Sequence, residues 1–146
     1  MKTKQVVYVG IYSATLFAIQ IALSSLPNVE LVSFLFVIYG LSLSFKMNLA
    51  ISFVFVTLEV IAWGFGDWAI GYYWIWPLWA LFSGLWGILF GLLFAINHGL
   101  FYGFHYSLAY WIKGLSFDLI HVISNYIIML ILFNPVLKLF KENHRK

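Results

Sequence analysis

Three polar side chains near the C-terminal end of the sequence have the spacing of a binding surface. Asp118, His121 and Asn125 are separated by intervals of three and four residues. On a helix such positions fall within an arc of about 60°. A carboxylate, an imidazole and an amide on one face offer both hydrogen-bond donors and acceptors. The stripe could bind a polar solute, or it could only hydrogen-bond to neighbouring helices.

Asp118 also has a structural interpretation, because we expect it to open the last helix. There its carboxylate could accept hydrogen bonds from unpaired backbone N–H groups and interact favourably with the positive end of the helix dipole. His121 and Asn125 would then lie one and two turns deeper, where each polar group needs a partner. Capping and solute binding are compatible roles for Asp118.

Composition predicts the surroundings of this stripe. The chain is 64% hydrophobic and 9% charged, with a mean hydropathy of +0.97. That leaves too little polar surface for a water-soluble globule, so we predict one integral-membrane domain over residues 1–146. The absence of cysteine excludes disulfides and thiolate chemistry. The pI near 9.2 reflects basic tails, which report membrane orientation rather than a nucleic-acid partner.

About 20 residues per span and tight connections leave room for six helices. The sequence therefore predicts an all-α membrane protein, a compact bundle of six transmembrane helices. The predicted spans cover residues 6–25, 30–45, 47–64, 72–94, 98–113 and 118–138. The fourth break is expected at 97–99 and the fifth at 113–116, where polar residues and glycine interrupt the apolar runs.

Lysines and arginines in both tails predict that both termini are cytoplasmic. In this topology Lys46 and His98 lie on the cytoplasmic side. Four of the five acidic residues gather toward the outer face, together with Lys113; the acidic residues are Glu30, Glu59, Asp67 and Asp118. The basic start followed by an apolar run could alternatively be a signal peptide.

Two stripes of small residues could allow close helix packing. The first is Gly10, Ala14, Ala18 and Ala22, and the second is Ser83, Gly87, Gly91 and Ala95. Each repeats every fourth residue, which lets a partner helix approach to backbone contact. Spacing alone does not distinguish a neighbouring helix of this chain from another protein.

Signatures of catalysis and nucleotide binding are missing. The sequence has no GxxxxGK[ST], HExxH or GxSxG motif and no dinucleotide-binding turn. We therefore predict no enzymatic activity, no cofactor and no metal. His98 and His105 are seven residues apart, a spacing that could ligate haem or a metal, so a haem protein or membrane enzyme that also uses His121 is a further alternative.

Three segments carry a resemblance to a known family. They are SATLFAIQIALSSLPNVELVSFLFVIYG at 13–40, GFGDWAIGYYWIWPLWAL at 64–81 and AYWIKGLSFDLIHVISNYIIMLILFNPVLKLF at 109–140. The chain resembles the substrate-binding S components of energy-coupling factor (ECF) transporters, which often read AYWIxGxPFDxxHxxGNF at the fifth-to-sixth helix junction. Here Ser116 stands where that pattern favours proline, and Ser124 where it favours glycine.

The resemblance implies capture of a vitamin or related micronutrient at the outer face of a prokaryotic cell membrane. Partners would be a T component, which docks on an AxxxA motif that maps onto Ala14 and Ala18, and two ATPase subunits. The implied site residues are Asp118, His121 and Asn125 as polar contacts, Tyr73, Trp74 and Trp76 as stacking surfaces, and Glu30 as a gate residue.

Two simpler interpretations remain open. An interfacial belt explains many of the tryptophans and tyrosines in residues 66–86 without any ligand. A small assembly or structural protein of the membrane would use both small-residue stripes to join other helices and would bind no solute.

Overall fold

The computed structural model describes residues 1–26, 29, 31–81 and 89–144. Within these ranges the chain is helical and contains no strand, which confirms the all-α prediction. The described helices are α1 (Thr3–Leu23), α2 (Leu31–Ser42), α3 (Phe45–Trp63), α4 (Asp67–Leu81), α5 (Leu89–Tyr102) and α6 (Phe104–His144).

Among the described residues, three helices are long and apolar enough to cross a membrane: Thr3–Leu23, Phe45–Trp63 and Phe104–Glu142. Two shorter apolar helical segments cover Leu31–Ser42 and Leu92–Tyr102. These apolar helices indicate a membrane protein. α4 has 15 residues and α5 has 14, so each extends over about 22 Å, less than the ~30 Å of a typical hydrocarbon core.

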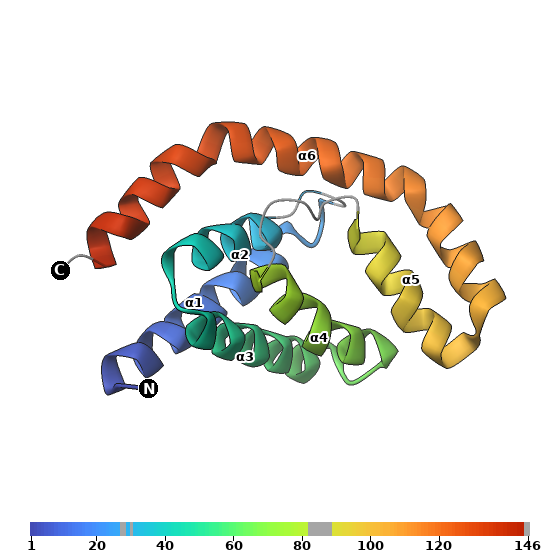
Figure 1. Ribbon diagram of the computed structural model, residues 1–146, viewed down its shortest axis with the longest axis horizontal. Coiled ribbons are helices and arrows are strands. Elements are labelled where there is room, and N and C mark those ends of the chain that lie inside the picture. The colour runs from blue at the N-terminus through green and yellow to red at the C-terminus, as the bar shows by residue number, and fades with distance from the viewer. Residues whose placement is uncertain (27–28, 30, 82–88, 145–146) are drawn as a thin grey trace.

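Consecutive helices run in opposite directions (Figure 1). The N-terminus, the α2–α3 connection and the C-terminal end of α6 lie together at one end of the molecule. We call this the basic end because its described lysines are Lys2, Lys4, Lys46, Lys138 and Lys141. The α3–α4 connection and the α5–α6 turn lie toward the other end.

Two predicted connections are wrong. Residues 97–99 lie inside α5 and residues 113–116 lie inside α6, while the predicted span 72–94 is divided between α4 and α5. The chain turns instead at Gly103, whose φ of 86° suits a residue without Cβ. Glycine and serine cost a helix at most about 1 kcal/mol each, so Gly114 and Ser116 do not end a helix that packs on either side of them.

The core lies where α2, α3 and α4 meet. The ring of Trp76 stacks on Phe36 with a centroid separation of 4.8 Å and meets the edge of Phe55 at 5.9 Å. All three side chains are buried. Seven of the 12 residues of α2 are buried, which places this short helix at the centre of the bundle.

α1 packs along α3 through one face only. Val9, Ser13 and Leu16 are its buried residues, and the Ser13 hydroxyl donates to the backbone carbonyl of Ile51 at 3.1 Å. The spacing of four and three residues is that of a single helical face. The opposite face of α1 is exposed.

α6 forms an arc across the other helices (Figure 1). Its 41 residues correspond to a length of about 60 Å. The first part lies beside α5, where the Ser107 hydroxyl donates to the carbonyl of Ala95 at 2.7 Å. The last part packs on α1 and α2, since the ring of Phe140 lies 5.1 Å from Tyr12 and 5.3 Å from Tyr39. The predicted polar stripe occupies the stretch between them.

Candidate functional site

The polar stripe lies on the inward face of α6. His121 is 8% exposed, and Asp118 and Asn125 are half-buried. The neighbouring side chains Leu119 and Ile120 are more than half exposed. α6 therefore turns this polar stripe toward the rest of the protein and the neighbouring aliphatic side chains outward, as expected for polar groups in an apolar solvent.

Asp118 does not cap a helix, so that prediction is wrong. It lies 14 residues after Phe104, the first residue of α6. Backbone N–H groups in a helix interior already donate within the helix. Its carboxylate is therefore available for other partners, and His121, one turn further on, interacts with it electrostatically.

Two buried acceptors of the stripe receive no hydrogen bond from the part of the chain that the structure describes. They are Oδ2 of Asp118 and Oδ1 of Asn125. Leaving a buried acceptor unpaired costs about 1–3 kcal/mol, and more for a charged group. A bound molecule that donates hydrogen bonds to these oxygens would recover that free energy, so the stripe has the chemistry of a polar recognition site.

A second polar cluster lies where the start of α4 meets the end of α5. Nδ1 of His98 lies 3.4 Å from Oδ2 of Asp67. The predicted topology placed these residues on opposite faces of the membrane, and their contact overturns that placement. The reason is the shifted connection: because α5 ends at Tyr102, His98 lies in its last turns beside the start of α4.

Asp67 is the first residue of α4 and precedes its apolar run. A hydrogen bond from the Tyr102 hydroxyl lowers the pKa of Asp67, and further lowering comes from the backbone N–H of Trp68 and from His98, against the opposing effect of desolvation. The Trp68 bond measures 2.8 Å. Asp67 is therefore ionised at neutral pH and is the fixed negative charge of this cluster.

Asn97 joins the two helices of this cluster. It is fully buried, its Nδ2 donates to the backbone carbonyl of Asp67 at 3.1 Å, and its Oδ1 accepts from Nε1 of Trp74 at 3.3 Å. A Cβ added to Gly71 would lie 3.1 Å from the amide group of Asn97. The absence of a side chain at Gly71 thus leaves room for the amide of Asn97 between α4 and α5.

Tyr110 connects the two clusters. Its ring centroid lies 4.3 Å from that of His98, and it interacts electrostatically with both Asp118 and Asp67. We call the resulting series the polar track, which consists of Asp67, His98, Tyr110, Asp118, His121 and Asn125. The track combines two carboxylates, two imidazoles, a phenol and an amide from three helices.

The three predicted stacking residues point to different surroundings. Trp74 is half-buried and bonds to Asn97, beside the polar track. Tyr73 shares a hydrogen bond of 3.1 Å with the hydroxyl of Thr57 on α3, and Trp76 belongs to the core. Trp74 therefore contacts the residue that precedes His98 of the track. Glu30, the predicted gate residue, lies outside the described residues.

His98 and His105 do not share a helical face, because α5 ends before Gly103 and α6 begins after it. His105 is exposed. Among the described residues, no group of three or more histidine, aspartate or glutamate side chains is placed to hold a metal ion.

The first small-residue stripe forms an exposed ridge on α1. Gly10, Ala14, Ala18 and Ala22 are all exposed, and a Cβ added to Gly10 would meet nothing within 4 Å. The ridge is therefore not used to pack α1 against α3. The second stripe differs, because Ala95 is 2% exposed; Ser83 and Gly87 lie outside the described residues.

Sequence reasoning misses the contributions of Asn97, Tyr102 and Tyr110. A usable signal exists for Tyr110, since counting back from Asp118 by four and eight residues on one helix reaches Gly114 and Tyr110. The signal is not used because a connection is expected at 113–116, which would place Tyr110 and Asp118 on different helices.

A scan of protein-family models finds no match to this chain, and searches of curated proteins and of solved structures also find none.

Proposed function

We propose that the chain is the substrate-binding S component of an ECF-type importer and that the polar track binds its solute. The observation that carries the proposal is the pair of buried acceptors, Asp118 Oδ2 and Asn125 Oδ1, on the inward face of an apolar helix. A protein that only joined helices would pair these oxygens internally, because unpaired polar atoms in apolar surroundings are costly.

The track indicates the chemistry of the solute. Asp118 and Asn125 present acceptors, so the solute must carry N–H or O–H donors. Two aromatic side chains lie at the other end of the track: the ring centroid of Tyr110 lies 4.3 Å from that of His98, and the indole N–H of Trp74 donates to Asn97 Oδ1 at 3.3 Å. A small heteroaromatic molecule with donor groups and little net charge, as many vitamins are, fits this combination.

The orientation that we propose has six spans with the basic end in the cytoplasm of a prokaryotic cell. Lysines on short tails and connections favour the cytoplasmic side, and Lys4, Lys46 and Lys141 all belong to the basic end. The end that holds Asp67 and His98 then faces outward, and solute would enter the track from there.

The exposed ridge on α1 supports a partner in the membrane. A T component would dock on Ala14 and Ala18, whose exposure leaves room for a close helix contact. Two ATPase subunits would supply the nucleotide hydrolysis for which this sequence has no motif.

Mass spectrometry of small molecules released on denaturation tests the proposal. The protein would be purified from cells grown in rich medium and compared with Asp118→Ala plus Asn125→Ala. The matched control is Lys113→Ala plus Ser116→Ala, which alters exposed residues of the same helix. We expect one vitamin-like mass in the wild type and the control, and a loss of at least about tenfold in the stripe variant because two hydrogen bonds disappear.

If no mass differs between the proteins, even with a vitamin panel added during purification, the protein is an assembly protein that binds no solute. Substitutions in the α1 ridge test whether partner docking and solute binding use different surfaces. Ala14→Trp plus Ala18→Trp should abolish uptake in cells and leave the released mass unchanged.

A further inference from the structure

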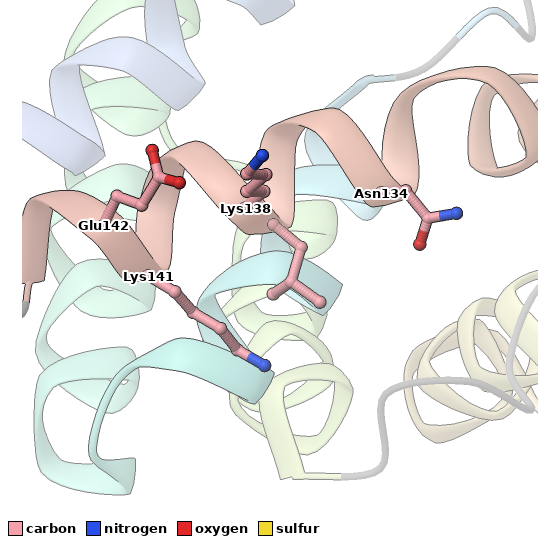
Figure 2. A pocket seen from close by; sticks show the side chains of 5 residues that line it. Asn134, Lys138, Lys141 and Glu142 are labelled. Carbon is pink, nitrogen blue, oxygen red and sulfur yellow. The ribbon is translucent and has the colours of Figure 1, made fainter.

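The basic end carries a cleft that the proposed function does not use. It has a volume of about 330 Å³ and is lined by Asn134, Leu137, Lys138, Lys141 and Glu142. Figure 2 shows the labelled side chains projecting from successive turns near the end of α6, Lys138 and Glu142 on one side of the ribbon and Lys141 and Asn134 on the other. Asn134, Lys138, Lys141 and Glu142 are exposed, whereas Leu137 is half-buried.

The cleft sits where the end of α6 packs on α1 and α2. The ring of Phe140, between Lys138 and Lys141, lies 5.1 Å from Tyr12 of α1 and 5.3 Å from Tyr39 of α2. Asn134, the cleft residue nearest to the polar track along α6, is nine residues after Asn125, a separation of about 13 Å. The cleft is therefore a separate site from the polar track.

The lining has a definite chemistry. Two ammonium groups and the amide of Asn134 supply donors for an anion, Leu137 supplies an aliphatic wall, and the carboxylate of Glu142 accepts hydrogen bonds. A bare inorganic anion would gain from the lysines and lose from Glu142. An anionic group that also carries hydroxyls would use both.

The charge around the cleft also favours an anionic ligand. Lys2, Lys4 and Lys46 belong to the same end as Lys138 and Lys141, and Glu142 is the acidic residue described there. In a membrane protein a basic end lies at headgroup depth, where lysines attract anionic lipids. The exposed Leu139 beside the cleft, at 60% exposure, is placed to contact acyl chains.

We propose that this cleft binds the headgroup of an anionic glycerophospholipid with a hydroxyl-bearing headgroup, of the phosphatidylglycerol type. The phosphodiester lies between Lys138 and Lys141, the headgroup hydroxyls donate to Glu142, and the glycerol backbone rests on Leu137. Bound lipid then links the end of α6 to one leaflet of the membrane.

Native mass spectrometry of the full chain in detergent micelles tests the site with palmitoyl-oleoyl phosphatidylglycerol as the added lipid. We expect phosphatidylglycerol adducts to exceed phosphatidylcholine adducts, and Lys138→Gln plus Lys141→Gln to weaken the former by about tenfold or more. Lys2→Gln plus Lys4→Gln is the matched control, because it removes the same charge from the same end but leaves the cleft intact. Glu142→Gln should reduce the preference for phosphatidylglycerol over phosphatidic acid.

Equal loss in the cleft variant and the control would overturn the proposal, since net charge alone would explain binding. Displacement of the lipid by inorganic phosphate at equal concentration would assign the cleft to a free anion instead. Should the double variant fail to fold, Leu137→Trp fills the cleft without changing charge, and unchanged adducts in that variant would also overturn the proposal.

Discussion

At the scale of single residues, Asn97 is the polar side chain that holds α4 and α5 in register. It is completely buried, it donates to the carbonyl of Asp67, and it accepts from the indole of Trp74. Those two bonds place Asp67 within reach of His98. The contact between Asp67 and His98 in the polar track therefore depends on an amide that carries no charge itself.

Asn97→Leu preserves the side-chain size and removes both hydrogen bonds. The carbonyl of Asp67 and the indole of Trp74 would lose their partner, and we expect the free energy of unfolding to fall by about 1–3 kcal/mol. Titration with sodium dodecyl sulfate in mixed micelles measures this change. Asn134→Leu, at an exposed amide, is the control and should have little effect; equal stability of the two variants would contradict the role of Asn97.

At the scale of helices, the first half of the chain is predictable from sequence and the second half is not. The predicted spans 6–25, 30–45 and 47–64 match α1, α2 and α3 to within three residues at each end. In this half of the chain, the polar residues and glycine that are expected to end the spans do lie at the ends of the helices. In the second half the same signals occur inside helices, because glycine and serine are tolerated where tertiary packing holds the helix.

The polar stripe shows a similar division. Its three residues could be placed on one face from spacing alone, since that face depends only on helical periodicity. Its extension through Tyr110 to His98 and Asp67 depends on the turn at Gly103, whose φ of 86° is a property of the folded backbone. No local pattern distinguishes Gly103 from Gly99 or Gly114 as the turning point.

Ser116→Pro tests the continuity of α6. It introduces proline at the position where the pattern of the ECF S components, which the sequence resembles, favours proline. In the structure Ser116 lies in the helix interior, so proline would remove an intrahelical hydrogen bond and clash with the preceding turn. We expect a loss of about 3 kcal/mol or more in the free energy of unfolding. Ser116→Ala should change it by less than about 0.5 kcal/mol, and a proline variant as stable as the alanine variant would show that a connection lies at 113–116.

At the scale of the whole molecule, the separation of charge gives a testable orientation. The chain contains no cysteine, so single cysteines can be introduced without background. Phe65, 69% exposed in the α3–α4 connection, and Lys46, exposed at the start of α3, mark the two ends. In intact cells an impermeant maleimide should label Phe65→Cys, and Lys46→Cys only after permeabilisation, because the orientation that we propose places the basic end in the cytoplasm.

Glu142→Cys should follow Lys46→Cys, since both positions belong to the basic end. Labelling of Lys46→Cys in intact cells, with Phe65→Cys protected, would reverse the orientation. Labelling of both in intact cells would show that the two ends do not lie on opposite sides of the membrane.

The length of α6 has a mechanical consequence. With 41 residues it extends over about 60 Å, twice the thickness of the hydrocarbon core, and its two ends are held by different helices. The polar stripe lies near the middle of this arc. A bend of about 10° there would displace an end ~30 Å away by about 5 Å, which is close to the rise of one helical turn.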